Sequence, residues 1–147
     1  MRTFVPFVAD EQIEMIGAGL LDHSLSKAMW THAAHFSATL WLLSRRSELD
    51  LAVEMPKIIR SYNEAKGGAN TDTNGYHETI TQVSIRAARA FLLAAPPQPL
   101  FESCNALMRS SLGERDWLLE YWSRDRLFSV QARRAWLDPD LKSLPFA

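Results

Sequence analysis

The chain has 147 residues and carries 16 lysines and arginines against 17 aspartates and glutamates, which gives a net charge of -1 at pH 7. This length suits one domain that buries a core of its own. The balanced charge excludes the basic surface of a typical nucleic-acid-binding protein, so we expect no nucleic-acid partner. The single cysteine, Cys104, excludes an internal disulfide and fits a cytoplasmic protein. No segment reaches the roughly 18 apolar residues of a membrane helix, so we expect no membrane partner.

Two helices are predicted in the N-terminal third of the chain. The first begins at Asp10 and ends near Asp22, because an acidic start is followed by apolar residues at helical spacing. The second follows Ser24 or Ser26, either of which can serve as its N-cap, and runs to about Arg45. Its apolar residues face nearly all directions, which predicts a helix at the centre of the fold.

A third helix is predicted from Ser47 to Lys66, with a kink or a division into two stacked segments at Pro56. The polar loop 67–75 follows, and it is rich in residues whose side chains bond their own backbone. This loop leads directly into a fourth helix, which starts around Tyr76 and stops before the next cluster of prolines.

The C-terminal part is predicted to hold helices at about 100–110 and 114–122, a turn at 131–137 and an extended tail. No alternating strand pattern of useful length appears anywhere. The sequence therefore predicts an all-α, single-domain bundle of about five to six helices with an extended C-terminal tail. Residues 10–95 would form the core bundle, and residues 99–147 the C-terminal helices and tail.

Three of the four histidines belong to two short motifs. His32 and His35 lie three residues apart in an apolar run, which places them on one face of a helix. His77 opens the predicted fourth helix, directly after the polar loop. Neutral imidazoles on the inner faces of two helices are common components of metal sites and of acid/base sites. These three side chains are therefore the leading candidates for chemistry.

One hypothesis is a mononuclear metal site in a small metal-dependent enzyme. His32, His35 and His77 would bind one divalent transition metal, zinc or iron. Glu78 or Asp72 would act as the fourth ligand or as the general base. The chain lacks the His-Glu-x-x-His motif of metalloproteases and the paired Glu-x-x-His motifs of di-iron bundles. The pattern therefore predicts a ligand set and leaves the reaction open.

Other polar residues predict a small polar ligand in the same region. The end of the third helix, the loop and the start of the fourth helix are neighbours by connectivity. Arg60, Asn63 and Tyr76 would therefore orient a substrate there. Thr39 lies on the same stripe of its helix as His35 and is a further candidate for ligand binding. Assembly into a homo-oligomer is also compatible with the sequence.

Two metal-free interpretations compete with the metal site. In the first, the protein is a non-catalytic ligand-binding or interaction domain, and its histidines form a structural hydrogen-bond network. In the second, His77 takes part in acid/base catalysis with His32 or His35 as its partner. Its neighbour Glu78 points about 100° away on a helix, which makes that pair a poor one. Glu78 is also interpretable as an acid that stabilises the start of the helix.

The aromatic residues near the C-terminus are interpreted as core and as packing for the tail, because they have helical spacing or lie in turns. The arginines within 124–126 and 133–134 are interpreted as solvated surface charge. Neither group is assigned a functional role from the sequence.

Several motifs stand out beyond the histidines alone. They are Thr31-His32-Ala33-Ala34-His35, Tyr62-Asn63-Glu64, Asn70-Thr71-Asp72-Thr73 and Gly75-Tyr76-His77-Glu78-Thr79, with Tyr121-Trp122-Ser123 nearer the C-terminus. In this combination the chain resembles a family of small uncharacterised bacterial proteins. The resemblance covers most of the chain and implies a stand-alone all-helical domain. It implies no particular activity.

Overall fold

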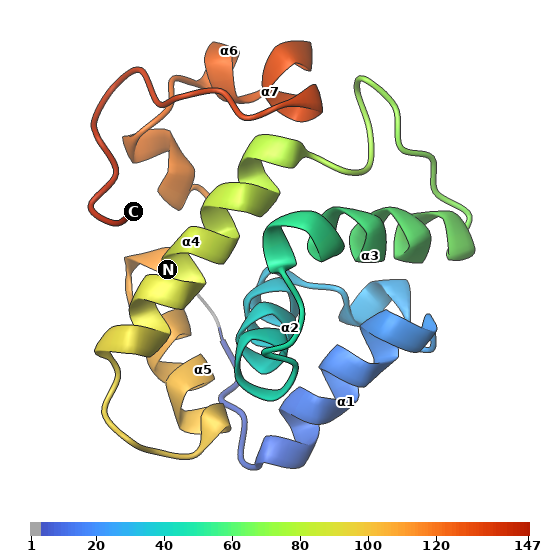
Figure 1. The fold of residues 1–147 in the computed structure, drawn as a ribbon, viewed down its shortest axis with the longest axis vertical. Coiled ribbons are helices and arrows are strands. Elements are labelled where there is room, and N and C mark those ends of the chain that lie inside the picture. The colour runs from blue at the N-terminus through green and yellow to red at the C-terminus, as the bar shows by residue number, and fades with distance from the viewer. Residues whose placement is uncertain (1–3) are drawn as a thin grey trace.

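Five helices of ten or more residues form most of the fold in the computed structural model, which describes residues 4–147 (Figure 1). They are α1 (Asp10–Asp22), α2 (His32–Arg45), α3 (Leu51–Ala65), α4 (Glu78–Ala94) and α5 (Leu100–Arg109). The shorter helical segments are η1 (Lys27–Met29), η2 (Ser111–Gly113), η3 (Trp117–Glu120), α6 (Arg124–Leu127) and α7 (Val130–Arg134). Residues 4–147 contain no β-strand, so the predicted all-α class is confirmed. None of these helices is both long and apolar enough to cross a bilayer.

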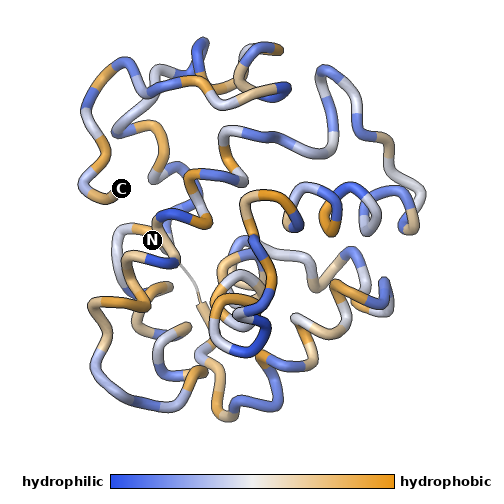
Figure 2. The backbone as a smooth tube through the Cα atoms, in the orientation of Figure 1, coloured by the Kyte–Doolittle hydropathy of each residue, from blue (hydrophilic) through white to orange (hydrophobic). Residues whose placement is uncertain are grey.

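Helix α2 lies at the centre of the fold, as its apolar sequence predicts. It packs against α1, α4 and α5, and Leu40 and Leu42 on it are fully buried. The surrounding helices are amphipathic: hydrophobic and hydrophilic stretches alternate along α1 and α3 (Figure 2). On α3 the buried positions Leu51, Met55 and Ile59 recur every four residues, which forms one apolar face.

The start of α2 differs from the sequence-based prediction. Neither Ser24 nor Ser26 caps this helix; the short turn η1 follows Ser26, and α2 begins only at His32. Thr31 is the N-cap, since its hydroxyl accepts a hydrogen bond from the backbone N–H of Ala34 at 3.2 Å. His32 and His35 therefore belong to the first turns of α2 and not to its middle.

Helix α3 passes through Pro56 as one helix, so of the two predicted effects of this proline, a kink or a division into two segments, the division does not occur. A proline at this position cannot donate the backbone hydrogen bond that would normally reach the carbonyl of Ala52. The side chain of Gln82 on α4 replaces it, because Gln82 Nε2 donates to Ala52 O at 2.9 Å. The cost of the proline is thus reduced by a contact with the neighbouring helix.

The polar loop between α3 and α4 is folded around the side chain of Asn70. Asn70 Oδ1 accepts hydrogen bonds from Asn63 Nδ2 and from the backbone N–H of Tyr76, each at 3.0 Å. Asn70 Nδ2 donates to the backbone carbonyl of Arg60 at 3.2 Å. Gly75 has a φ of 83°, and a Cβ atom there would lie 2.4 Å from the carbonyl oxygen of Ala69. The loop therefore requires glycine at position 75 and holds Tyr76 in place.

The predicted helix at 114–122 is wrong. Glu114 has extended backbone angles, and only the single turn η3 follows. Trp117 and Trp122 are buried in the main core, so packing of these large rings overrides the local helical pattern. Residues 115–137, here called the C-terminal roof, contain η3, α6 and α7 and lie over the N-terminal end of α4 (Figure 1).

The C-terminal roof is joined to α4 by a buried threonine. Thr79 Oγ1 lies 2.7 Å from the carbonyl oxygen of Ala132 and 3.0 Å from that of Ala135. It also accepts a hydrogen bond from the backbone N–H of Leu137 at 3.1 Å. One fully buried hydroxyl therefore contacts three backbone groups of the roof.

Candidate functional site

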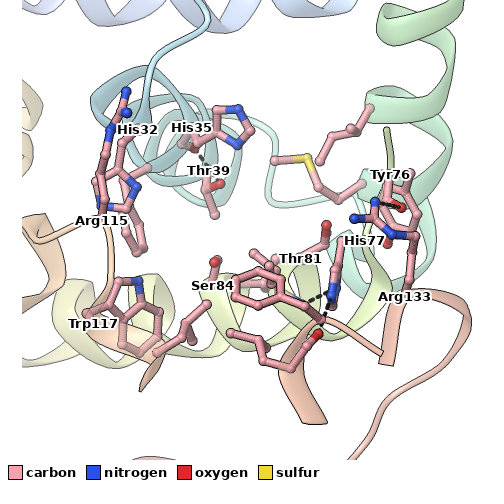
Figure 3. Close-up of a pocket in the computed structure, with 18 of the residues that line it drawn as sticks. His32, His35, Thr39, Tyr76, His77, Thr81, Ser84, Arg115, Trp117 and Arg133 are labelled. Atoms are coloured by element: carbon pink, nitrogen blue, oxygen red, sulfur yellow. Dashed lines mark hydrogen bonds between the residues drawn. The ribbon is translucent and has the colours of Figure 1, made fainter. Parts of the chain in front are cut away.

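A cavity of about 630 Å³ lies between α2, α3 and α4 on one side and the C-terminal roof on the other (Figure 3). Its wall is mainly apolar and includes Trp30, Phe36, Ile80, Trp117, Leu127 and Phe128. Cavities of several hundred Å³ with a mainly apolar lining and a few polar groups are typical of sites for small organic molecules. The cavity is therefore the candidate functional site.

Six of the nine residues predicted for the site line this cavity: Thr39, Asn63, Tyr76 and the three histidines His32, His35 and His77. They reach it from α2, from the end of α3 and from the loop into α4. In Figure 3, His32 lies at one end of the cavity, beside Arg115, and His77 lies at the other end, beside Tyr76 and Arg133. The structure thus brings the predicted region together but spreads the histidines across it.

The remaining three predicted residues lie outside the cavity lining. Asp72 forms an exposed ion pair with Arg134, and the hydrogen bonds from this arginine hold the pKa of the Asp72 carboxyl below its usual value. Glu78 Oε1 accepts a hydrogen bond from the hydroxyl of Tyr76 at 2.5 Å. The guanidinium of Arg60 lies over the ring of the same tyrosine, 4.4 Å from its centroid. Glu78 and Arg60 therefore contact the cavity residue Tyr76 from behind the lining, and Asp72 pairs with Arg134 outside the cavity.

His77 uses both of its ring nitrogens within the fold. It is the N-cap residue of α4, and its Nδ1 accepts a hydrogen bond from the backbone N–H of Ile80 at 3.1 Å. The proton must then be on Nε2, which lies 2.8 Å from the carbonyl oxygen of Leu127 and donates to it. Burial lowers the pKa of His77, which favours the neutral ring that this arrangement needs. His77 therefore joins the start of α4 to the C-terminal roof.

His32 uses one of its two ring nitrogens in a hydrogen bond within the fold. Its Nε2 lies 2.9 Å from the carbonyl oxygen of Leu112 in η2, and its ring meets Phe36 edge to face. Burial is the main cause that lowers the pKa of His32, and the charge of Arg115 lowers it further. Since the carbonyl of Leu112 can only accept, Nε2 is the donor and Nδ1 is the nitrogen that stays available.

His35 is the histidine that the fold leaves free for another partner. Its ring stacks on Trp30 with 3.7 Å between the ring centroids. Neither ring nitrogen has a hydrogen-bond partner among residues 4–147. The side chain is exposed and lines the cavity, and many protein atoms lie close to its ring. This enclosure, with a smaller effect of His32, lowers the pKa of His35 to about 4, so the ring is neutral at pH 7.

Within the described part of the chain, no group of three or more histidine, cysteine, aspartate and glutamate side chains is arranged to hold a metal ion. His77 would have to give up one of its two hydrogen bonds to bind one. His32 Nδ1 and a nitrogen of His35 are the imidazole groups that a metal could use without such a change. The three-histidine metal site stays a prediction, and it would need side chains to move.

The lowered pKa values predict that the protein loses stability in mild acid. An unfolded histidine takes up a proton near pH 6.5, whereas His32, His35 and His77 stay neutral in the folded state to lower pH. The unfolded state therefore binds more protons as the pH falls, and the free energy of unfolding falls with it. For the buried His77 the slope approaches at most about 1.4 kcal/mol per pH unit. Urea unfolding between about pH 7 and about pH 5 measures this slope, and stability that is flat or rises toward about pH 5 would contradict it.

Several cavity residues were not identified from the sequence. The sequence pattern predicts solvated charge at Arg124 and Arg133, yet both line the cavity, together with Arg115. Phe128 also lines it and is 54% exposed. These residues belong to the C-terminal roof. The roof and α2 are far apart in the sequence, and folding brings them to opposite sides of the cavity (Figure 3). No local pattern in the sequence could have shown that placement.

No protein-family model, curated protein or solved structure matches this chain. The cavity and its lining side chains are therefore the features of this chain that indicate a function.

Proposed function

We propose that the chain binds a small organic molecule in the cavity, with a mainly apolar body and at least one polar group. The observation that carries this proposal is the ring of His35, whose nitrogens have no hydrogen-bond partner among the described residues and which lines a mainly apolar cavity of about 630 Å³. His35 is exposed, so its ring nitrogens are open to solvent and to a ligand that enters the cavity. The neutral imidazole can both donate and accept a hydrogen bond, so it can orient a polar group of the ligand.

Ser84 supports the proposal from the opposite wall. It lies on α4, lines the cavity, and its hydroxyl has no hydrogen-bond partner among the described residues. Figure 3 shows Ser84 on the α4 side and His35 on the α2 side, with the hollow between them. Two free polar groups on facing walls, with apolar side chains around them, are the arrangement of a site that orients one molecule.

The test is binding of N-phenyl-1-naphthylamine, an uncharged apolar dye whose fluorescence rises in apolar surroundings. We expect saturable binding by the wild type. Ser84→Trp would fill the cavity with a large ring and should weaken binding at least tenfold, which corresponds to about 1.4 kcal/mol. Ser84→Phe, a smaller obstruction, should weaken it less and covers the case that the tryptophan variant does not fold.

Arg89→Trp is the matched control, because Arg89 is exposed on the same helix and does not line the cavity. It should bind the dye as the wild type does. Equal dye binding by wild type, Ser84→Trp and Ser84→Phe, all with the helical circular dichroism of the wild type, would show that the dye does not enter the cavity. A wild type that binds no dye would overturn the proposal.

A metal-dependent enzyme is the second candidate, favoured by the two α2 histidines that line the same cavity. The same proteins, prepared without a histidine tag, test it. If zinc or iron belongs to the site, about one equivalent should bind and raise the melting temperature of the wild type, and His35→Ala should abolish both effects. Dye binding by metal-free protein, with no stabilisation by zinc or iron, would favour the ligand-binding function.

A further inference from the structure

The charges that line the cavity are unbalanced in favour of arginine. Arg115, Arg124 and Arg133 contribute to its wall, and Asp116 is the acidic residue among its lining side chains. The chain as a whole carries a net charge of -1. The local excess of positive charge is therefore a property of this cavity and not of the protein surface in general.

These three arginines are also not neutralised by ion pairs. Among the described residues, none of Arg115, Arg124 and Arg133 lies in a salt bridge with a carboxylate. By contrast, Arg134, the neighbour of Arg133, pairs with Asp72 outside the cavity. Arg124 lies near the ring of Phe128, 5.9 Å from its centroid. The cavity thus keeps positive charge available for an occupant.

Arg133 is the arginine that the fold holds in position. Its Nη1 donates to the backbone carbonyls of Gly75 and Tyr76, at 3.0 Å and 3.2 Å. A guanidinium has five N–H donors, so Nε and Nη2 remain for another acceptor. Because the carbonyls fix the side chain, less conformational entropy is lost when those donors bind a ligand. Such a group suits the bidentate recognition of a carboxylate or phosphate.

We infer that the cavity selects an organic anion, whose carboxylate or phosphate binds Arg133 and whose ring-bearing apolar body lies against the aromatic wall. This inference rests on the proposed function and names the class of its ligand. Arg115, at the opposite end of the cavity in Figure 3, adds to the positive potential that attracts the anion. The aromatic wall, which includes Trp30, Phe36 and Trp117, offers ring faces and edges to the body of the ligand.

Calorimetric titration with three compounds on one naphthalene ring tests the inference. We expect 2-naphthoate to bind the wild type at least tenfold more tightly than its uncharged counterpart 2-naphthylmethanol, with an advantage that shrinks as sodium chloride is raised. 2-Naphthyl phosphate distinguishes the two sources of negative charge. Tighter binding of the phosphate would support the anion class and assign a phosphate ester, and tighter binding of naphthoate would assign a carboxylate.

Arg133→Gln provides the decisive comparison. It should weaken 2-naphthoate binding at least tenfold while it changes 2-naphthylmethanol binding less than threefold, so the uncharged compound reports that the cavity is intact. Arg134→Gln is the matched control and should change neither affinity. If Arg133→Gln weakens both compounds equally, or if the wild type binds both equally, the inference is wrong while the proposed function stands. If neither compound binds the wild type, both fail.

Discussion

Replacement of His77 by alanine is expected to lower the free energy of unfolding by about 2–4 kcal/mol. Loss of the N-cap acceptor leaves the N–H of Ile80 without its partner, which costs about 1 kcal/mol. Loss of the Nε2 donor leaves the carbonyl of Leu127 unpaired in a buried position, which costs about 1–3 kcal/mol. Urea unfolding followed by circular dichroism measures the total.

His77→Asn separates the two contributions. Asparagine is among the best N-cap residues, so it can still accept from the N–H of Ile80. Its side chain is too short to reach the carbonyl of Leu127, and only that contact should be lost. The asparagine variant should therefore lie between the wild type and His77→Ala in stability. If both variants stay within about 0.5 kcal/mol of the wild type, His77 does not join α4 to the roof as described.

The helix boundaries that the sequence predicted well depend on local chemistry. α1 begins at Asp10 and ends at Asp22, as its acidic start and apolar spacing predict. α4 ends at Ala94, directly before the proline cluster. Prolines and N-terminal acids act within one helical turn, so their effect is visible in a short stretch of sequence.

The start of α2 was missed because two local signals compete. Ser24 and Ser26 are good N-cap residues, but Thr31 is another, and it is the one whose hydroxyl caps α2. The choice between them depends on where Leu25 and Trp30 pack: Leu25 is buried and accepts a hydrogen bond from the hydroxyl of Tyr62 on its carbonyl. That contact joins residues 37 positions apart, which spacing along the chain cannot show.

The same limit applies to the histidines. The position of His77 near the end of α3 was predictable, because one loop joins α3 directly to α4. The individual roles of the histidines were not, because the partner of His32 is a carbonyl 80 residues away and that of His77 is a carbonyl 50 residues away. A backbone carbonyl has no signature in the sequence. The sequence does not distinguish the three imidazoles, but the fold does. His32 and His77 donate hydrogen bonds to carbonyls of the C-terminal part, whereas the ring nitrogens of His35 have no hydrogen-bond partner among the described residues.

The C-terminal roof gives the cavity a second wall that the sequence did not indicate. Its short helices begin with serine caps, as in Ser123 and Ser129, and could be read as simple surface turns. Its position depends on buried contacts with α4, through His77 and Thr79, and on the packing of Trp122 against Trp136. Because these contacts form only in the folded chain, the arginines of the roof looked like ordinary surface charge.

Thr79→Val is expected to lower the free energy of unfolding by about 2–3 kcal/mol, although the two side chains have nearly the same shape. Valine cannot replace the hydroxyl that contacts the carbonyl of Ala132 and the N–H of Leu137. These backbone groups would then lack their partner in a buried setting, which costs about 1–3 kcal/mol for each unsatisfied group. Urea unfolding measures the loss, and Thr79→Ser should restore most of it because serine keeps the hydroxyl.

The loss caused by Thr79→Val should be concentrated in the C-terminal roof. Hydrogen exchange should show faster exchange of the roof amides than of the amides in α1, which forms no hydrogen bond with the Thr79 hydroxyl. Because the roof forms one wall of the cavity, binding of the naphthylamine dye should weaken in the same variant and recover in Thr79→Ser. If exchange instead increases equally in the roof and in α1, the hydroxyl stabilises the whole domain and has no special role in holding the roof against α4.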